Sequence, residues 1–146
     1  MHVLSDYRIG QTFAAGPLEV TEGEIIAFAE RYDPQPFHLD TEAAKSTFFK
    51  GLAASGWLTA SLTMRMMVES EIRTAWGLIG REVESLKWLL PVRPGDILRS
   101  VIEVIEIVPT KPDRGWVRFR TDTYNQKDEL VQTMTSCGLA PTGKSA

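Results

Sequence analysis

Apolar and polar residues alternate with the period of a helix near the start of the chain. Thr21-Glu-Gly-Glu24 is a capping-box sequence, in which the Thr21 hydroxyl and the Glu24 carboxylate each satisfy a free backbone N–H. Apolar residues then recur at helical spacing as far as Tyr32. The pattern predicts a helix that begins after Thr21 and ends near Tyr32.

Two prolines interrupt this pattern. Pro34 and Pro36 lack a backbone N–H, and each disfavours helical geometry in the residue before it. We therefore expect an extended loop from Asp33 to Asp40, followed by a short helix from Thr41 to Ser46.

The middle of the chain carries a longer apolar stretch, from Ala53 to about Glu69, with no proline and almost no charge. Its apolar residues lie on nearly all sides of a helical wheel. This distribution is typical of a helix that is buried over most of its surface.

The second half of the chain shows the two-residue alternation of β-strands. Four strands are predicted, and the turn residues between them allow consecutive strands to pair as antiparallel neighbours: Glu82 to Leu90, Ile97 to Val108, Trp116 to Asn125 and Glu129 to Ala140. A long apolar helix followed by such strands predicts an α+β fold, the hot-dog arrangement, in which an antiparallel sheet wraps around the central helix. An exposed sheet edge favours pairing with a second copy, so we expect a homodimer or a higher homo-oligomer.

Length and composition fit one globular domain over residues 1–146, with 43% hydrophobic and 24% charged residues. The formal net charge is -3 and no long basic run occurs, which argues against nucleic acid as a partner. No apolar run approaches the roughly 20 residues that cross a bilayer, and the N-terminus does not resemble a secretory signal. We therefore expect no membrane segment and a cytoplasmic location.

Cys137 is the only cysteine, so neither an intrachain disulfide nor a cysteine-based metal cluster can form. Cys137 lies in an apolar strand-like run with no histidine nearby, which does not suit a reactive thiolate.

The residues most suited to chemistry are Asp33 and His38, in the segment that carries the two prolines. A carboxylate and an imidazole held close together can share one water, with one group taking a proton while the other orients the water or supplies a proton. On its own, such a pair is more often structural: an aspartate that caps the loop and a satisfied buried histidine. The other histidine, His2, is expected in a frayed terminus.

A second candidate segment opens the apolar helix, around Ser55, Gly56 and Trp57. The first N–H groups of a helix have no internal acceptors, and the helix dipole adds positive potential there, so such a site can stabilise an enolate-like oxygen. Gly56 would let a substrate carbonyl approach the backbone closely. The absence of its side chain fits tight packing of the helix on the sheet equally well. Trp57 is a candidate to line an acyl pocket.

Together these residues resemble the MaoC-like dehydratase family, close to the (R)-specific enoyl-CoA hydratases. The resemblance rests on motifs in a fixed order: Asp33-x-x-Pro-x-His38-x-Asp40, Ala43-Ala44, Phe49-x-Gly51-Leu52-x-Ala54-Ser55-Gly56-x-Leu58-Thr59 and Trp88-x-x-Pro91-Val92-Arg93-Pro94-Gly95-Asp96. It implies a hot-dog homodimer that acts on a CoA or carrier-protein thioester without a metal or organic cofactor. It also implies a lyase of fatty acid metabolism.

By the same resemblance, Asp33 and His38 match the family's catalytic pair, and Gly56 matches the glycine whose amide binds the thioester oxygen. Water would then add across the 2,3 double bond of an enoyl thioester. The segment from Pro91 to Asp96 is expected to be mainly a tight turn, in which Arg93 is a candidate to reach a CoA phosphate.

Two other functions remain open at this point. A thioesterase on the same fold would hydrolyse acyl thioesters, although such enzymes usually rely on one carboxylate and lack the Asp-x-x-Pro-x-His motif before the central helix. A non-catalytic dimer would only bind an acyl chain or serve as a subunit of a larger assembly.

Overall fold

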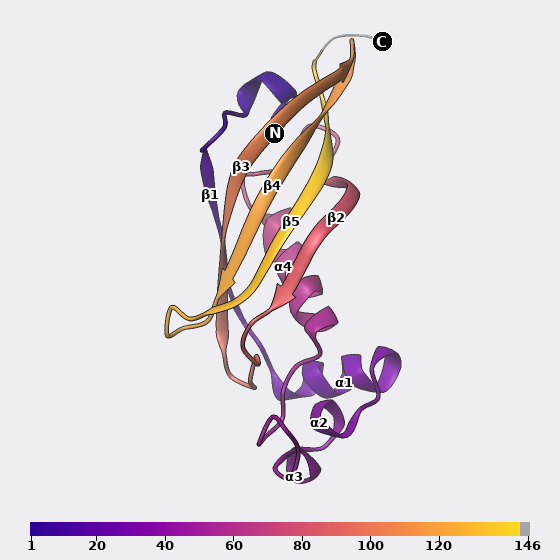
Figure 1. Cartoon of the computed structure of the whole chain (residues 1–146), viewed down its shortest axis with the longest axis vertical. Helices are drawn as coiled ribbons and strands as arrows, with labels where there is room; N and C mark the ends of the chain where they lie inside the picture. The colour runs from indigo at the N-terminus through magenta and orange to yellow at the C-terminus, as the bar shows by residue number, and fades with distance from the viewer. Residues whose placement is uncertain (144–146) are drawn as a thin grey trace.

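The strands of the protein form one five-stranded antiparallel sheet (Figure 1). The computed structural model describes residues 1–143 and orders the strands β1-β3-β4-β5-β2. Their bounds are β1 Thr12–Glu19, β2 Ile79–Trp88, β3 Ile97–Lys111, β4 Arg114–Tyr124 and β5 Leu130–Pro141. The four predicted strands are confirmed, with bounds that differ by a few residues.

One strand and one pairing differ from the expectation. Strand β1 was not predicted, because its Ala-Ala-Gly-Pro centre lacks the β-branched residues that signal a strand. Strands β3, β4 and β5 pair in chain order as expected, but β2 pairs with β5 and not with β3. The reason is that β1 and β4 already occupy both sides of β3.

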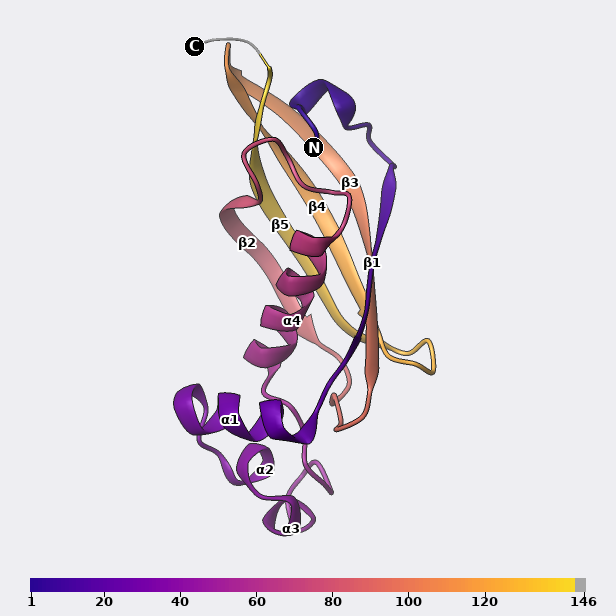
Figure 2. The same ribbon diagram turned by 180° about the vertical axis from the view of Figure 1, so that it is seen from behind.

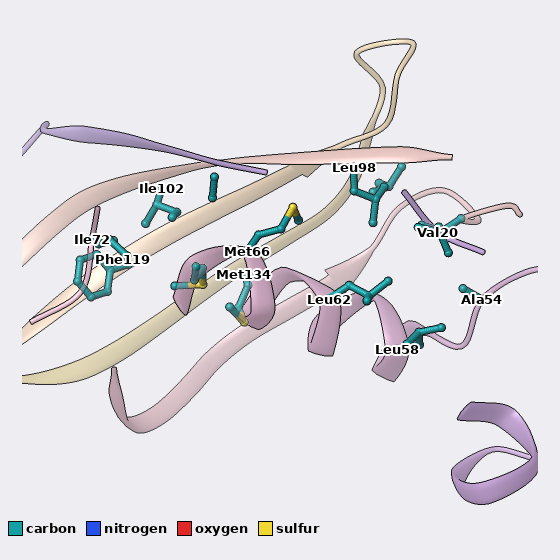
Figure 3. Close-up of a cluster of buried hydrophobic side chains, with 14 of the residues drawn as sticks. Val20, Ala54, Leu58, Leu62, Met66, Ile72, Leu98, Ile102, Phe119 and Met134 are labelled. Carbon is teal, nitrogen blue, oxygen red and sulfur yellow. The ribbon is translucent and has the colours of Figure 1, made fainter. Parts of the chain in front are cut away.

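The predicted apolar helix is α4, Gly56–Glu69, which begins after the cap residue Ser55 and lies along one face of the curved sheet (Figure 2). Figure 3 shows Leu58, Leu62 and Met66 of α4 within the buried cluster. The same cluster contains sheet residues that include Leu98, Ile102, Phe119 and Met134. Burial of each such side chain stabilises the fold by about 1.5–3 kcal/mol relative to exposure. This contact holds the helix in the hollow of the sheet.

The opposite side of α4 is exposed in the single chain. Trp57, Met64 and Val68 are 59%, 44% and 42% exposed. The expectation of a helix buried over most of its surface is therefore wrong for one chain, because the sheet covers only one side of the helix. No helix within residues 1–143 is long and apolar enough to cross a membrane.

The N-terminus is fixed and not frayed. His2 forms a bridge with Thr74, its backbone N–H donates to the carbonyl of Arg73, and its ring stacks on Tyr7 at 5.2 Å. The 3₁₀ helix η1, Leu4–Asp6, follows. The expectation of a frayed terminus is wrong because the polar residues at this end carry contacts that local sequence does not reveal.

Three short helices gather at the N-terminal end of α4 (Figures 1 and 2). Helix α1, Glu22–Tyr32, has the predicted capping box and the predicted end. The expected extended loop contains α2, Pro36–Leu39, because Pro36 stands at the first helical position, where its missing N–H costs nothing. Helix α3, Thr41–Ala44, is the expected short helix, and the Asp40 carboxylate caps it.

Candidate active site

The ends of two helices bring Asp33 and His38 together. Asp33 is the last, capping residue of α1, and His38 lies in α2. Oδ2 of Asp33 lies 3.3 Å from Nε2 of His38. The His38 ring is almost fully buried, and the carboxylate of Asp33 keeps part of its surface exposed. Helix α2, which begins at Pro36 where an extended loop was expected, places His38 close to Asp33.

The backbone carbonyl of Ala53 determines that Nδ1 is a ring nitrogen of His38 that carries a hydrogen. Nδ1 of His38 lies 2.6 Å from this oxygen, and since a carbonyl only accepts, Nδ1 must carry a hydrogen. In the neutral ring, Nε2 then holds a lone pair that faces the carboxylate of Asp33. Two acceptors face each other, so the arrangement calls either for a proton between them or for a water that lies beside both and donates to each.

Several neighbours act on the carboxyl group of Asp33. Burial alone would raise its pKa, but hydrogen bonds from Gln35 and Ser55 and the nearby His38 outweigh this effect, so the pKa of Asp33 lies below its usual value. The amide of Gln35 donates to Oδ1 of Asp33 at 2.5 Å. Asp33 is therefore ionised at neutral pH and can accept a hydrogen bond from a water.

The segment before α4 holds this arrangement in place. The guanidinium of Arg93 donates to the carbonyls of Phe49, Gly51 and Leu52 at 2.5, 2.9 and 3.2 Å. The N–H of Ala53 donates to Phe37 in α2 at 3.0 Å. Three backbone carbonyls hold the guanidinium of Arg93, which gives this side chain a structural role; its suggested contact with a CoA phosphate stays a prediction.

The predicted residues at the start of α4 lie in the same cavity as the pair. Ser55 caps the helix, and its hydroxyl accepts from the N–H of Trp57 at 3.3 Å. Within residues 1–143, the N–H of Gly56 has no hydrogen-bond acceptor. The cavity has a volume of about 600 Å³ and is lined by residues that include Asp33, His38, Ser55, Gly56 and Trp57. All five predicted site residues therefore border one space.

Sequence reasoning missed Trp88, at the end of β2. A Cβ atom on Gly56 would lie 2.4 Å from two ring carbons of Trp88, so the indole covers the Gly56 backbone directly. Its ring also meets that of Trp57 edge to face, at 5.0 Å. The missing side chain of Gly56 thus reflects tight packing, the alternative left open above, in addition to a place beside the cavity. The glycine was a signal of close approach, but only the fold shows which residue approaches.

A second cavity of about 280 Å³ lies along the C-terminal half of α4. It is mostly apolar, and its lining includes Met64, Met67 and Cys137. Burial raises the pKa of the Cys137 thiol, which agrees with an unreactive side chain. Residues 1–143 contain no group of three or more histidine, cysteine or acidic side chains placed to hold a metal ion.

The chain thus has a hot-dog fold, and an aspartate and a histidine meet in a cavity at the start of its central helix. Residues 5–122 match the MaoC-like domain, so the chain belongs to that family. A MaoC-like dehydratase from Rhodospirillum rubrum, of known structure, is 42% identical, with a TM-score of 0.94 over 99% of this chain and 100% of that chain.

Two further proteins are similar to this chain in sequence. An (R)-specific enoyl-CoA hydratase from Rhodospirillum rubrum is 30% identical over 127 residues, which are 83% of this chain and 80% of that protein. The uncharacterized protein YdeM from Bacillus subtilis is 32% identical over 128 residues, 88% of this chain and 91% of that protein. The resemblance to hydratases therefore extends over most of the chain.

Proposed function

We propose that the protein adds water reversibly to the 2,3 double bond of a 2-enoyl thioester to give the 3-hydroxyacyl thioester. The observation that carries this proposal is the 3.3 Å approach of Asp33 Oδ2 to His38 Nε2 inside the cavity that Gly56 also borders. The similarity to an (R)-specific enoyl-CoA hydratase supports an acyl-CoA as substrate, with an acyl-carrier thioester as the related alternative.

The pair would act on one water. Asp33, ionised, and Nε2 of His38 each accept a hydrogen bond from this water, which places its oxygen for attack on C3. As the C3–O bond forms, the pair takes a proton from the water, and the electrons of the double bond move toward the thioester oxygen. The enolate then takes that proton back at C2, so the pair returns to its starting state.

The N–H of Gly56 would stabilise the negative charge on the thioester oxygen. A backbone donor at a helix start is already oriented, and it binds a developing oxyanion more strongly than a neutral carbonyl. The reaction adds only the elements of water, with no change in oxidation state overall, so it needs no redox cofactor. The pair would move the proton, and the Gly56 N–H would stabilise the developing charge.

Two assays with the purified protein test the proposal. Hydration removes the conjugated double bond of crotonyl-CoA or a longer or branched 2-enoyl-CoA, and the ultraviolet absorbance falls. A thiol reagent detects any free CoA from the corresponding saturated acyl-CoA. We expect hydration without thiol release. Thiol release would instead identify a thioesterase, and a lack of both reactions would favour the acyl-binding alternative.

We also propose that two copies pair through β2. This strand is at one edge of the sheet, and most of its residues are exposed, including Ile79 and Val83. The exposed residues Met64 of α4 and Val83 of β2 line the same apolar cavity, so the apolar surface is continuous from the helix to the strand. Pairing of two β2 strands would satisfy both edges and bury more than about 1,000 Å².

A further inference from the structure

A chain of buried hydrogen bonds reaches Trp88 from inside the sheet. The indole Nε1 of Trp88 donates to Oε1 of Gln132 in β5, at 3.0 Å. Nε2 of the same amide donates to Oγ1 of Thr63 in α4, also at 3.0 Å. Gln132 and Thr63 are completely buried. The bonds therefore connect β2, β5 and α4, and they run from the partly exposed indole of Trp88 to side chains that are completely buried.

The neighbours of Gln132 determine which end of its amide faces which residue. An indole N–H only donates, so the amide oxygen of Gln132 must face Trp88 and its NH₂ must face Thr63. The hydroxyl of Thr63 donates to the carbonyl of Thr59 at 2.9 Å, which leaves its oxygen to accept from Gln132. An amide that is bound at both ends in this way favours one position of the indole.

The far end of the network does not touch the cavity. Oγ1 of Thr123 lies 3.1 Å from Oγ1 of Thr63, and Ser100 lies 2.8 Å beyond it. Thr123 and Ser100 are buried, and neither lines the cavity that contains Asp33 and His38. The network thus has one end at the site and one end in the core, which allows the two to be tested separately.

We propose that Gln132 is a positioning residue. It holds the indole of Trp88 against Gly56, and this contact fixes the direction of the Gly56 N–H relative to Asp33 and His38. The indole lies so close to Gly56 that any shift of the ring must move the first turn of α4 or open a gap beside it. The inference rests on the hydration activity proposed above.

This role differs from a purely structural one in its kinetic effect. An oxyanion donor acts mainly on the transition state, so its misplacement lowers kcat and leaves KM almost unchanged. A buried polar network that serves only stability would lower the free energy of unfolding and the amount of folded enzyme, without changing kcat per folded molecule.

The test compares Gln132→Met with the matched variant Thr123→Val. Both substitutions keep the size of the side chain and remove one buried member of the same network. We expect both to lower the urea midpoint to a similar extent. Only Gln132→Met should lower kcat for a 2-enoyl-CoA, by roughly tenfold or more, with KM within about twofold of the wild-type value.

A second pair of variants tests the connection through the indole. Trp88→Phe keeps a ring over Gly56 but removes the N–H, so it should lower kcat about as much as Gln132→Met does. The double variant Trp88→Phe/Gln132→Met should be little worse than either single variant, because both changes break the same hydrogen bond.

Equal kcat in Gln132→Met and Thr123→Val, or additive losses in the double variant, would overturn the inference. Failure of the wild-type protein to hydrate any 2-enoyl-CoA would refute the proposed function, and this role with it. Hydration by the wild type with no kinetic difference between the two variants would refute only the role of Gln132.

Discussion

A single methyl group on Gly56 should disrupt the site. In Gly56→Ala the new Cβ would lie 2.4 Å from Cδ2 and Cε2 of Trp88 and 2.8 Å from Cζ2. Carbon atoms that are not bonded prefer about 3.5–4.0 Å, so the ring and the helix must separate by about 1 Å or more. Because Gln132 holds the ring, we expect the start of α4 to move.

The magnitude follows from this displacement. A shift of about 1 Å at reacting groups can reduce the rate by about 10²-fold, and we expect kcat of Gly56→Ala to fall by about that factor. Overpacking costs about 1–3 kcal/mol, and the better helix propensity of alanine offsets up to about 1 kcal/mol of this. The net loss of about 1–2 kcal/mol would lower Tm by roughly 2–8 °C in a chain of this size.

The assay is hydration of crotonyl-CoA, with kcat corrected for the folded fraction. Gly23→Ala is the matched control, since Gly23 also lies in the first turn of a helix but has no atom within 4 Å of a built Cβ. Wild-type kcat in Gly56→Ala, or an equal loss of kcat in Gly23→Ala, would refute the close-packing argument.

Three further outcomes are expected. Gln35→Leu removes a donor to Asp33, so the pKa of Asp33 should rise and the acid limb of the kcat profile should move to higher pH; an unchanged limb would contradict this. Arg93→Met leaves three backbone carbonyls without their donor, so urea unfolding should show that the free energy of unfolding falls by about 2–4 kcal/mol. A fall of less than about 0.5 kcal/mol would contradict the structural role of Arg93. Light scattering should find a dimer for the wild type and for Ile9→Lys, in the turn that precedes the other edge strand β1, but monomers for Val83→Lys; a monomeric wild type would refute pairing through β2.

The lowered pKa of Asp33 also has a consequence for folding. A carboxyl group whose pKa is lower in the folded than in the unfolded chain contributes stability above its unfolded pKa, near 3.8, and this contribution is lost as the pH falls through the folded pKa. The difference in free energy of unfolding between the wild type and Asp33→Asn should therefore decrease as the pH falls from above the unfolded pKa to below the folded pKa of Asp33.

The sequence predicts the elements whose signals are local. The capping box of Thr21 and Glu24 gives the start of α1, and the alternation of apolar residues gives β3, β4 and β5. Strand β1 gives no such signal, because its residues are held in the sheet by β3 and not by their own propensity. The two prolines suggested a loop, but Pro36 begins α2, since proline suits a first helical position.

The candidate site also combines residues that a local motif reveals with residues that only the fold brings together. The proposed catalytic side chains, Asp33 and His38, lie close in sequence, and a motif is enough to select them. Their support comes from distant parts of the chain: the carbonyl of Ala53 for His38, and Gln132 for Trp88. Such partners are set by the pairing of strands and the approach of a helix, and no local pattern records them.

The most direct test of the central claim is a kinetic comparison of Asp33→Asn, His38→Ala and the double variant. The chain offers two matched controls: Asp40→Asn, at a residue that caps α3, and His2→Ala, at the other histidine. If Asp33 and His38 act on one water, each single change should lower kcat for a 2-enoyl-CoA by roughly 10²–10⁴ with little change in KM, and the double variant should be scarcely worse than the worse single one. Both controls should keep wild-type kcat. Near-normal kcat in either single variant, or a double loss equal to the product of the two single losses, would contradict the account.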